Sequence, residues 1–249
     1  MKTLNLRFFI SLLIISVSLF SCSKDDEGEN QPDLSEVNLL FFDEENTISP
    51  PEGLTNNSNM HAVLASIQAT YFSNVGLHAG FFQIPTDADN SAPITAKNGR
   101  VAENIQTYVY GYGDAAVAYQ VTDRSSEYFF ELFIKYEGED YIKIYEAIQK
   151  KDGSEASFSY LDEEADERTI LLSWVYKKTS DGYTIKYIDE SSNTTFELQM
   201  HNDQSGSIVS KEDGVLSSEY TWDAVGNGTY KYYDSEGILE DSGSWEAAE

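Results

Sequence analysis

The chain has 249 residues and carries 43 Asp and Glu against 16 Lys and Arg, a net charge of −27 at neutral pH. So negative a chain repels nucleic acid and bare anionic lipid surfaces, which excludes nucleic acid as an expected partner. Its single cysteine, Cys22, excludes an internal disulfide, and the chain is long enough to bury a large core without one.

Residues 1–21 have the layout of a secretory signal peptide. Lys2 and Arg7 form a basic start, and an apolar run from Phe8 to Phe20 is followed by one small residue directly before Cys22. A helix that crosses a bilayer needs about 20 apolar residues. The run has only 13, which favours a cleaved leader over a short transmembrane anchor.

The residues around Cys22 resemble the lipobox of bacterial lipoproteins. Leu19, Ser21 and Cys22 match its aliphatic, small and cysteine positions, whereas Phe20 departs from it. The resemblance implies that Cys22 is the lipid attachment site, acylated on its sulfur (for example by palmitate) and on its α-amino group. Several acyl chains anchor a protein stably, whereas one does not. We therefore expect the chain to be anchored in the outer membrane through lipid on Cys22.

An acidic segment follows the cysteine directly. It consists of Ser23, Lys24, Asp25, Asp26 and Glu27. This segment resembles the surface-export signal of lipoproteins in the Bacteroidetes, which implies a location on the exterior face of the outer membrane. The alternative is a solvated linker, because residues 23–31 include no apolar side chain. Under either interpretation, residues 22–36 form an acidic flexible tether before a single β-rich domain, residues 37–249.

The first predicted elements of this domain are a short strand over residues 37–42, a turn-rich loop over residues 46–59 and a helix over about residues 59–79. Apolar side chains recur at the helical spacing of three and four residues, at Met60, Leu64, Ile67, Tyr71 and Val75. The remaining sides are also mostly apolar, with Ala62, Ala65, Ala69 and Phe72. A helix that is apolar nearly all round is buried, so we expect it to pack against the sheet or to plug it. Ser58 or Asn59 is the predicted N-cap.

Residues 86–103 are polar and turn-rich, and from residue 104 onward the pattern predicts strand after strand. The predicted strands are residues 105–113, 116–122, 128–136, 141–149, 156–161, 168–178, 183–189, 194–201, 206–210, 216–223, 229–233 and 238–245. Short strands joined by Asp-Gly and similar turns indicate a mainly β fold with a single antiparallel meander. The meander forms a curved sheet or a barrel, lipocalin-like or half-barrel in layout, with the one packed N-terminal helix at about 59–79. Residues 184–189 also resemble residues 229–234, which suggests two copies of a hairpin unit.

No catalytic or metal-binding motif stands out in the sequence. Ser205-Gly206-Ser207 lies in a turn signal and has no paired histidine, and His61, His78 and His201 lack the spacing of a metal site. Asp87-Ala88-Asp89-Asn90 resembles the start of a calcium loop, but Ala92 and Asn98 stand where glycine and glutamate are required. The charge run Glu163, Glu164, Asp166 and Glu167 is interpreted as a solvated loop. We therefore predict no catalytic residue, no metal and no cofactor.

Tyrosine is the residue type with the most functional interest, at 17 copies. Alternation places Tyr108, Tyr110 and Tyr112 on one side of a predicted strand, where they form a possible surface for a glycan, an apolar ligand or a protein partner. The alternative is that they stabilise the sheet, because aromatic residues pair well across strands. The tryptophans are predicted to be core residues; they are Trp174, Trp222 and Trp245.

These features favour a non-enzymatic binding or scaffold module at the cell surface. One alternative is a carrier that holds a lipid or other apolar ligand in a barrel cavity, which requires an unfilled interior. The other is a carbohydrate-active enzyme, which requires two facing carboxylates in an aromatic cleft.

Overall fold

The computed structural model describes residues 34, 37, 39, 48–73, 84–85, 88–94, 104–162 and 169–249. All of them belong to one compact unit, Leu34–Glu249. Cys22 and the segment Ser23–Glu27 lie outside the described residues, so lipid attachment and export stay predictions. Other predicted features also lie outside the described residues: most of the strand expected over residues 37–42, then His78, Asp87 and Asn98, and the charge run between Glu163 and Glu167.

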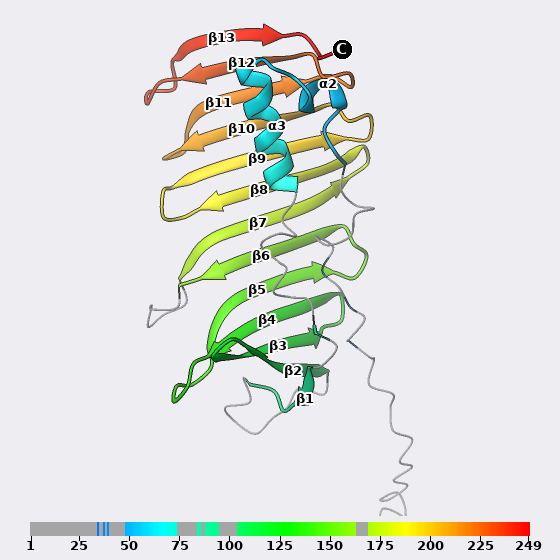
Figure 1. Cartoon of the computed structure of the whole chain (residues 1–249), viewed down its shortest axis with the longest axis vertical. Coiled ribbons are helices and arrows are strands. Elements are labelled where there is room, and N and C mark those ends of the chain that lie inside the picture. Colours follow the sequence, from blue (N-terminus) through cyan, green and yellow to red (C-terminus); the bar gives the residue numbers. More distant parts are fainter. Residues whose placement is uncertain are drawn as a thin grey trace, which may run out of the picture. The chain divides into compact units, whose positions relative to one another are not determined.

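Within the described residues, thirteen strands form one antiparallel sheet in which every strand pairs with its neighbours in sequence (Figure 1). The strands are β1 Asp89–Ser91, β2 Ile105–Tyr112, β3 Ala115–Asp123, β4 Glu127–Lys135, β5 Ile142–Lys150, β6 Glu155–Leu161, β7 Ile170–Thr179, β8 Gly182–Asp189, β9 Thr194–His201, β10 Gly206–Glu212, β11 Val215–Trp222, β12 Gly228–Tyr233 and β13 Leu239–Trp245. Because β1 and β13 are the two ends of this order, the sheet is open. The predicted antiparallel meander is confirmed, as an open sheet and not as a closed barrel.

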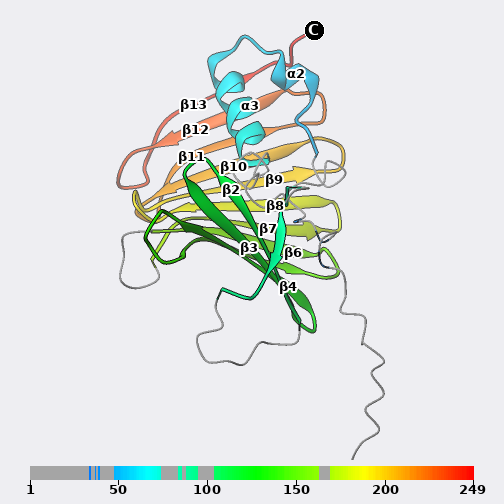
Figure 2. The same cartoon turned by 60° about the horizontal axis from the view of Figure 1, so that its bottom comes forward.

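Turn chemistry explains the regular meander. At the β10–β11 turn, Asp213 and Gly214 have φ of 51° and 79°. Two consecutive positive φ values are typical of the tight turn whose twist matches that of the paired strands, and Asp-Gly is a preferred sequence for it. Strand twist accumulates across the sheet, so in Figure 2 β2–β4 run steeply across the direction of β8–β13.

Two short elements were missed by the sequence-based prediction. Strand β1, Asp-Asn-Ser, is short, polar and exposed, so no apolar alternation marks it. Helix α2, Glu52–Thr55, lies in the segment predicted as a loop and is a single turn after Pro51. Its backbone contacts the C-terminal residues, since the Ala248 N–H donates to the Gly53 carbonyl at 2.8 Å.

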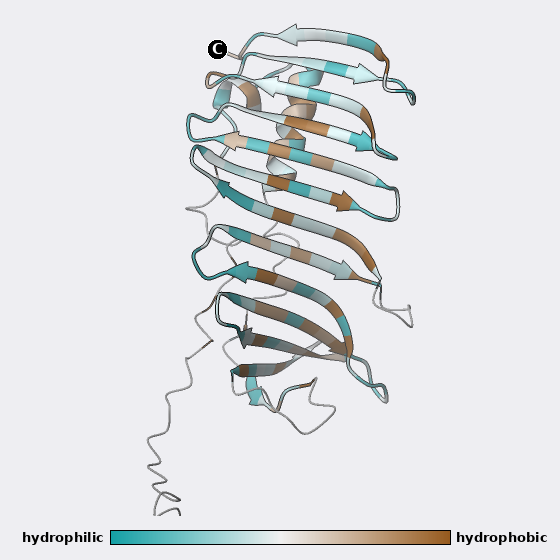
Figure 3. Ribbon diagram, turned by 180° about the vertical axis from the view of Figure 1, so that it is seen from behind, coloured by the Kyte–Doolittle hydropathy of each residue, from teal (hydrophilic) through white to brown (hydrophobic). Residues whose placement is uncertain are grey.

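The two faces of the sheet have different side chains because successive residues of a strand point to opposite faces. One face carries the core; a single cross-strand row joins Phe158, Trp174, Tyr187 and Phe196. The opposite face is polar over β8–β13 and includes exposed residues such as Lys186 and Thr229. Seen from behind, the ribbons of β12 and β13 are mostly pale or teal, whereas brown segments recur in β3–β9 (Figure 3). All three tryptophans are buried in the core, as predicted.

Helix α3, Met60–Ser73, lies across the strands on the core face, over β8–β12 (Figures 1 and 2). The helix was predicted to extend to about residue 79, but residues 74–79 lie outside the described part of the chain. It packs on the sheet as predicted. The prediction that it is buried on all sides is wrong, because one side of the helix is exposed to solvent. That exposed side is the candidate binding surface.

Candidate binding surface

The start of α3 is set by Asn59. Its side-chain Oδ1 accepts a hydrogen bond from the His61 N–H at 2.9 Å, and its carbonyl accepts one from the Val63 N–H at 3.0 Å. An asparagine at this position pairs one of the N–H groups that the first helical turn leaves without a partner. The predicted N-cap at Asn59 is therefore confirmed.

Helix α3 has two apolar faces of different kinds. The face toward the sheet is made mostly of small side chains and one aromatic, all buried: Ala62, Ala65, Ser66, Ala69 and Phe72. The opposite face carries the large apolar side chains Met60, Leu64, Ile67 and Tyr71, which are 67%, 37%, 59% and 44% exposed. At 3.6 residues per turn, the centres of these two faces lie about 180° apart around the helix. We call the exposed set, Met60, Leu64, Ile67 and Tyr71, the apolar stripe.

The apolar stripe also lacks charge. Residues 60–73 contain no Asp, Glu, Lys or Arg, although these four types make up 24% of the whole chain. Exposed apolar residues that occur singly are ordinary, whereas a contiguous set with charge depletion and with Met and Tyr is typical of the centre of a protein–protein interface.

The N-terminal end of α3 rests on strand β12 through His61. The His61 ring stacks on Tyr230 with a centroid distance of 3.6 Å and an interplanar angle of 11°. Its Nδ1 lies 3.0 Å from the Tyr232 hydroxyl, which lies 2.8 Å from the Tyr220 hydroxyl. Burial and the hydrogen bond with Tyr232 raise the pKa of Tyr220 above its ordinary value.

The C-terminal end of α3 rests on β8 and β9. The Phe72 ring lies 4.8 Å from Phe196 and 5.5 Å from Tyr187 between centroids. The Ser73 hydroxyl lies 2.9 Å from the Tyr183 hydroxyl. Burial raises the pKa of Tyr187 to about 12, with further contributions from Asp189 and Tyr71. Aromatic contacts at both ends therefore fix the position of the helix and, with it, the outward direction of the apolar stripe.

The segments of β8 and β12 that contact the two ends of α3 resemble each other in sequence. We call these two contact regions the seats of the helix. Tyr187 in residues 184–189 corresponds to Tyr232 in residues 229–234. The resemblance extends to the turns that follow, because Asp189 and Asp234 each accept hydrogen bonds from two backbone N–H groups of the next turn. The repeated pattern thus places one aromatic seat under each end of α3.

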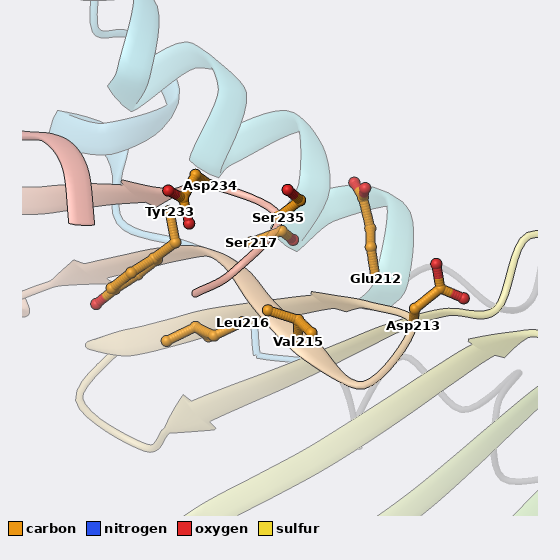
Figure 4. Close-up of a pocket in the computed structure, with 8 residues that line it drawn as sticks. All are labelled: Glu212, Asp213, Val215, Leu216, Ser217, Tyr233, Asp234 and Ser235. Carbon is orange, nitrogen blue, oxygen red and sulfur yellow. The ribbon is translucent and has the colours of Figure 1, made fainter. Parts of the chain in front are cut away.

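A shallow pocket lies at the hairpin ends of β10–β11 and β12–β13. It has an empty volume of about 460 Å³ that includes open solvent, and its lining is acidic with an apolar floor (Figure 4). The lining residues are Glu212, Asp213, Val215, Leu216, Ser217, Tyr233, Asp234 and Ser235. Several of these groups have bonding partners, since Asp213 accepts from Asn193 at 2.8 Å and Tyr233 donates to Glu219 at 2.6 Å.

The tyrosines predicted as a ligand surface have a different environment. Tyr108 is 5% exposed and belongs to the core, Tyr110 is half-buried, and the side chain of Tyr112 lies outside the described part of the structure. Tyr108 pairs with Tyr119 across the strands, at 6.3 Å between ring centroids. The ligand-surface role of this row stays a prediction, and the burial of Tyr108 does not support it.

A polar network is buried on the opposite face of β2–β5. The Gln120 amide donates to Glu131 at 2.7 Å and accepts from Thr107 at 3.2 Å, and Glu131 forms an ion pair with Lys143. Gln120 and Thr107 are almost fully buried. A buried polar group is tolerated when it is hydrogen-bonded, so we assign this network a structural role.

The remaining candidates for chemistry are dispersed. His61 belongs to the helix seat and His201 pairs with Asp181 at 3.1 Å on the surface. The described residues include no group of three or more His, Cys, Asp or Glu side chains that could hold a metal ion. No described helix is long and apolar enough to span a membrane.

Sequence reasoning identified the spacing of the apolar stripe but assigned it to the buried side. The useful signal was the size difference between faces: alanines occupy one side, and Met, Leu, Ile and Tyr the other. Small side chains let the helix backbone approach the sheet closely, whereas large apolar side chains provide contact area for a binding partner.

No protein-family model matches this chain, and no curated protein sequence matches it.

Proposed function

We propose that this chain is a lipid-anchored protein of the outer membrane, facing the cell exterior, whose β domain is a non-enzymatic docking module for another protein. The observation that carries the docking role is the apolar stripe on α3, which the sheet leaves uncovered. The anchor and the location rest on the lipobox-like residues at Cys22 and the acidic segment after it.

The alternatives receive less support from the geometry. A carrier of the barrel type needs a closed barrel, whereas the strands form an open sheet whose core face holds α3 and aromatic side chains. An enzyme of the glycosidase type needs two facing carboxylates in an aromatic cleft. In the pocket of Figure 4, Asp234 holds the following turn and Asp213 is bonded to Asn193.

Photo-crosslinking in the cells that produce the protein tests the docking role. A photoreactive phenylalanine analogue at position 67 should give a discrete protein adduct on illumination. The matched control is the same analogue at Lys186, which is exposed on the opposite face of β8 and should give none. Equal labelling at both positions, or no adduct at position 67, would contradict the docking role.

Two fractionation experiments test the anchor separately. The Cys22→Ala variant should move from the membrane fraction to the soluble fraction, because it cannot be acylated. Protease added to intact cells should degrade the wild-type protein, and full protection would contradict exposure at the cell exterior.

A further inference from the structure

Carboxylates occupy the ends of three alternate strands that α3 crosses (Figure 1). Asp189 ends β8, Glu212 ends β10, and Asp234 follows β12 directly. Asp189 and Glu212 pair with the same residue of β9, Thr194, so both lie in one cross-strand row. Glu212 and Asp234 line the same pocket (Figure 4). We call Asp189, Glu212 and Asp234 the acidic row.

The acidic row is on the face of the sheet that α3 covers. Within β8, Asp189 follows the core residues Ile185 and Tyr187 at two-residue intervals. Within β10, Glu212 follows the buried residues Ile208 and Ser210 in the same way. The three strands that carry the row run in the same direction, and α3 lies across all of them (Figure 1).

The spacing of the acidic row matches the repeat of a helix. Carboxylates on alternate strands are about 9.5 Å apart, twice the distance between neighbouring strands. Seven residues of an α-helix rise about 10.5 Å. The apolar stripe has the corresponding pattern, because Met60, Leu64, Ile67 and Tyr71 follow the 4-3-4 spacing of the apolar positions of a heptad.

We infer that the partner docks through an amphipathic helix that packs its apolar face on the apolar stripe and directs basic side chains, repeated about every seven residues, toward the acidic row. This inference rests on the proposed docking function and specifies its partner. Because the apolar stripe faces away from the sheet, these basic side chains attract the acidic row across a gap and not through direct ion pairs, and salt weakens the attraction.

A second copy of the chain and a lipid surface fit the same features less well. Two copies joined through α3 would bring two acidic rows together, and α3 itself supplies no Lys or Arg to offset them. Like charges across an interface oppose association. An anionic membrane surface is repelled by the same row and by the net charge of −27.

A designed peptide is the direct probe. It has three heptads on an alanine-rich background, with Leu at the first and fourth positions of each heptad and Lys at one flanking position, and it carries a fluorescent label. In anisotropy titrations at low salt, the mature chain should bind it at least tenfold more tightly than the same peptide with Glu in place of Lys. A third peptide, with its Leu residues dispersed around the helix, should also bind at least tenfold more weakly.

Matched variants of the chain separate the apolar contribution from the electrostatic one. Ile67→Asp should weaken binding of the Lys peptide at least tenfold, whereas Thr70→Asp, the same charge at an exposed position beside the stripe on the same helix, should not. Glu212→Gln should weaken binding about twofold to fivefold and reduce its salt dependence. The control Glu139→Gln, at an exposed site between β4 and β5, should leave affinity unchanged. Far-UV circular dichroism of each variant should match the wild type.

Several outcomes would overturn the inference. Equal affinity for the Lys and Glu peptides, or binding of neither, rejects a basic helical partner. Dimerisation in sedimentation experiments that Ile67→Asp abolishes assigns the stripe to a second copy instead. Binding to phosphatidylethanolamine–phosphatidylglycerol vesicles that Ile67→Asp abolishes assigns it to lipid. If the peptides fail while the adduct from position 67 persists in cells, only the partner class is rejected; loss of that adduct rejects the docking function itself.

Discussion

At the scale of single residues, two glycines of the sheet have very different surroundings. A Cβ atom at Gly228 would overlap both the ring of Trp245 and the carbonyl oxygen of Thr221, whereas one at Gly111 would meet nothing within 4 Å. The Trp245 indole is held in place, since its Nε1–H donates to the Gly226 carbonyl at 2.8 Å. The indole and the strand backbone therefore require the absence of a side chain at position 228.

We expect Gly228→Ala to lower the free energy of unfolding by about 1–3 kcal/mol, the usual cost of overpacking. Gly111→Ala is the control. It should be neutral or raise stability by up to about 1 kcal/mol, because alanine restricts the unfolded chain more than glycine does. Urea denaturation of both variants measures the difference. Equal effects of the two substitutions would show that the close approach to Trp245 is unimportant.

Acidic residues at the turns explain part of the negative charge. The Asp223 Oδ1 accepts hydrogen bonds from the N–H groups of Val225, Gly226 and Asn227, at 2.9–3.0 Å. The side-chain hydrogen bond from Asn227, followed by these backbone bonds, lowers the pKa of Asp223. A single carboxylate thus organises the β11–β12 turn.

This lowered pKa predicts a pH dependence of stability. A carboxyl group whose pKa is lower in the folded state stabilises the fold above its unfolded value of about 3.9, and the contribution is lost as the pH falls through the folded value. Asp223→Asn should therefore be less stable than wild type at pH 6, and the gap should narrow below about pH 4. Urea denaturation of both proteins over this pH range measures the difference in their free energy of unfolding. A difference that does not change with pH would contradict the role of the Asp223 charge.

At the scale of elements, α3 is held by one face and exposes the other. Phe72 is 4% exposed between Tyr187 and Phe196, whereas Ile67 belongs to the apolar stripe. The seats on β8 and β12 hold the two ends of the helix. Stability and binding are therefore expected to depend on different faces of the same helix.

We expect Phe72→Ala to lower the free energy of unfolding by about 3–5 kcal/mol, since it removes a buried ring and leaves a cavity. Ile67→Ala should change it by less than about 0.5 kcal/mol, as is usual for surface positions. Thermal or urea denaturation of the purified variants provides the comparison. A large loss of stability in Ile67→Ala would mean that the stripe contributes to the fold and is not available for docking.

At the scale of the whole molecule, the net charge of −27 opposes compaction. Acidic side chains are also close to one another at turns, as at Glu212 and Asp213. Salt screens such repulsion, because the Debye length falls from about 30 Å at 0.01 M to about 10 Å at 0.1 M.

We therefore expect the melting temperature to rise when NaCl increases from about 0.01 M to 0.2 M. A gain of about 1 kcal/mol would correspond to about 2–4 °C for a domain of this size. Differential scanning calorimetry measures the shift, with sucrose at matched osmolality as the control for general solute effects. A constant or falling melting temperature would show that ion pairs such as Lys231–Glu219, at 3.0 Å, outweigh the repulsion.

The amino-acid sequence by itself determined the strand-by-strand meander. Alternation and turn residues act between neighbours in the chain, so strands β2–β13 lie where they were predicted and pair in sequence order. Only the tertiary structure decided three features. The sheet stays open, with β1 and β13 as its two edges; one side of α3 is exposed; and Tyr108 is buried. The physical reason is that apolar spacing shows which residues share a side of a helix, but not which of two apolar sides another element covers. In α3 the sheet covers the side with alanines, because small side chains let the helix approach closely, and the large side chains are left exposed.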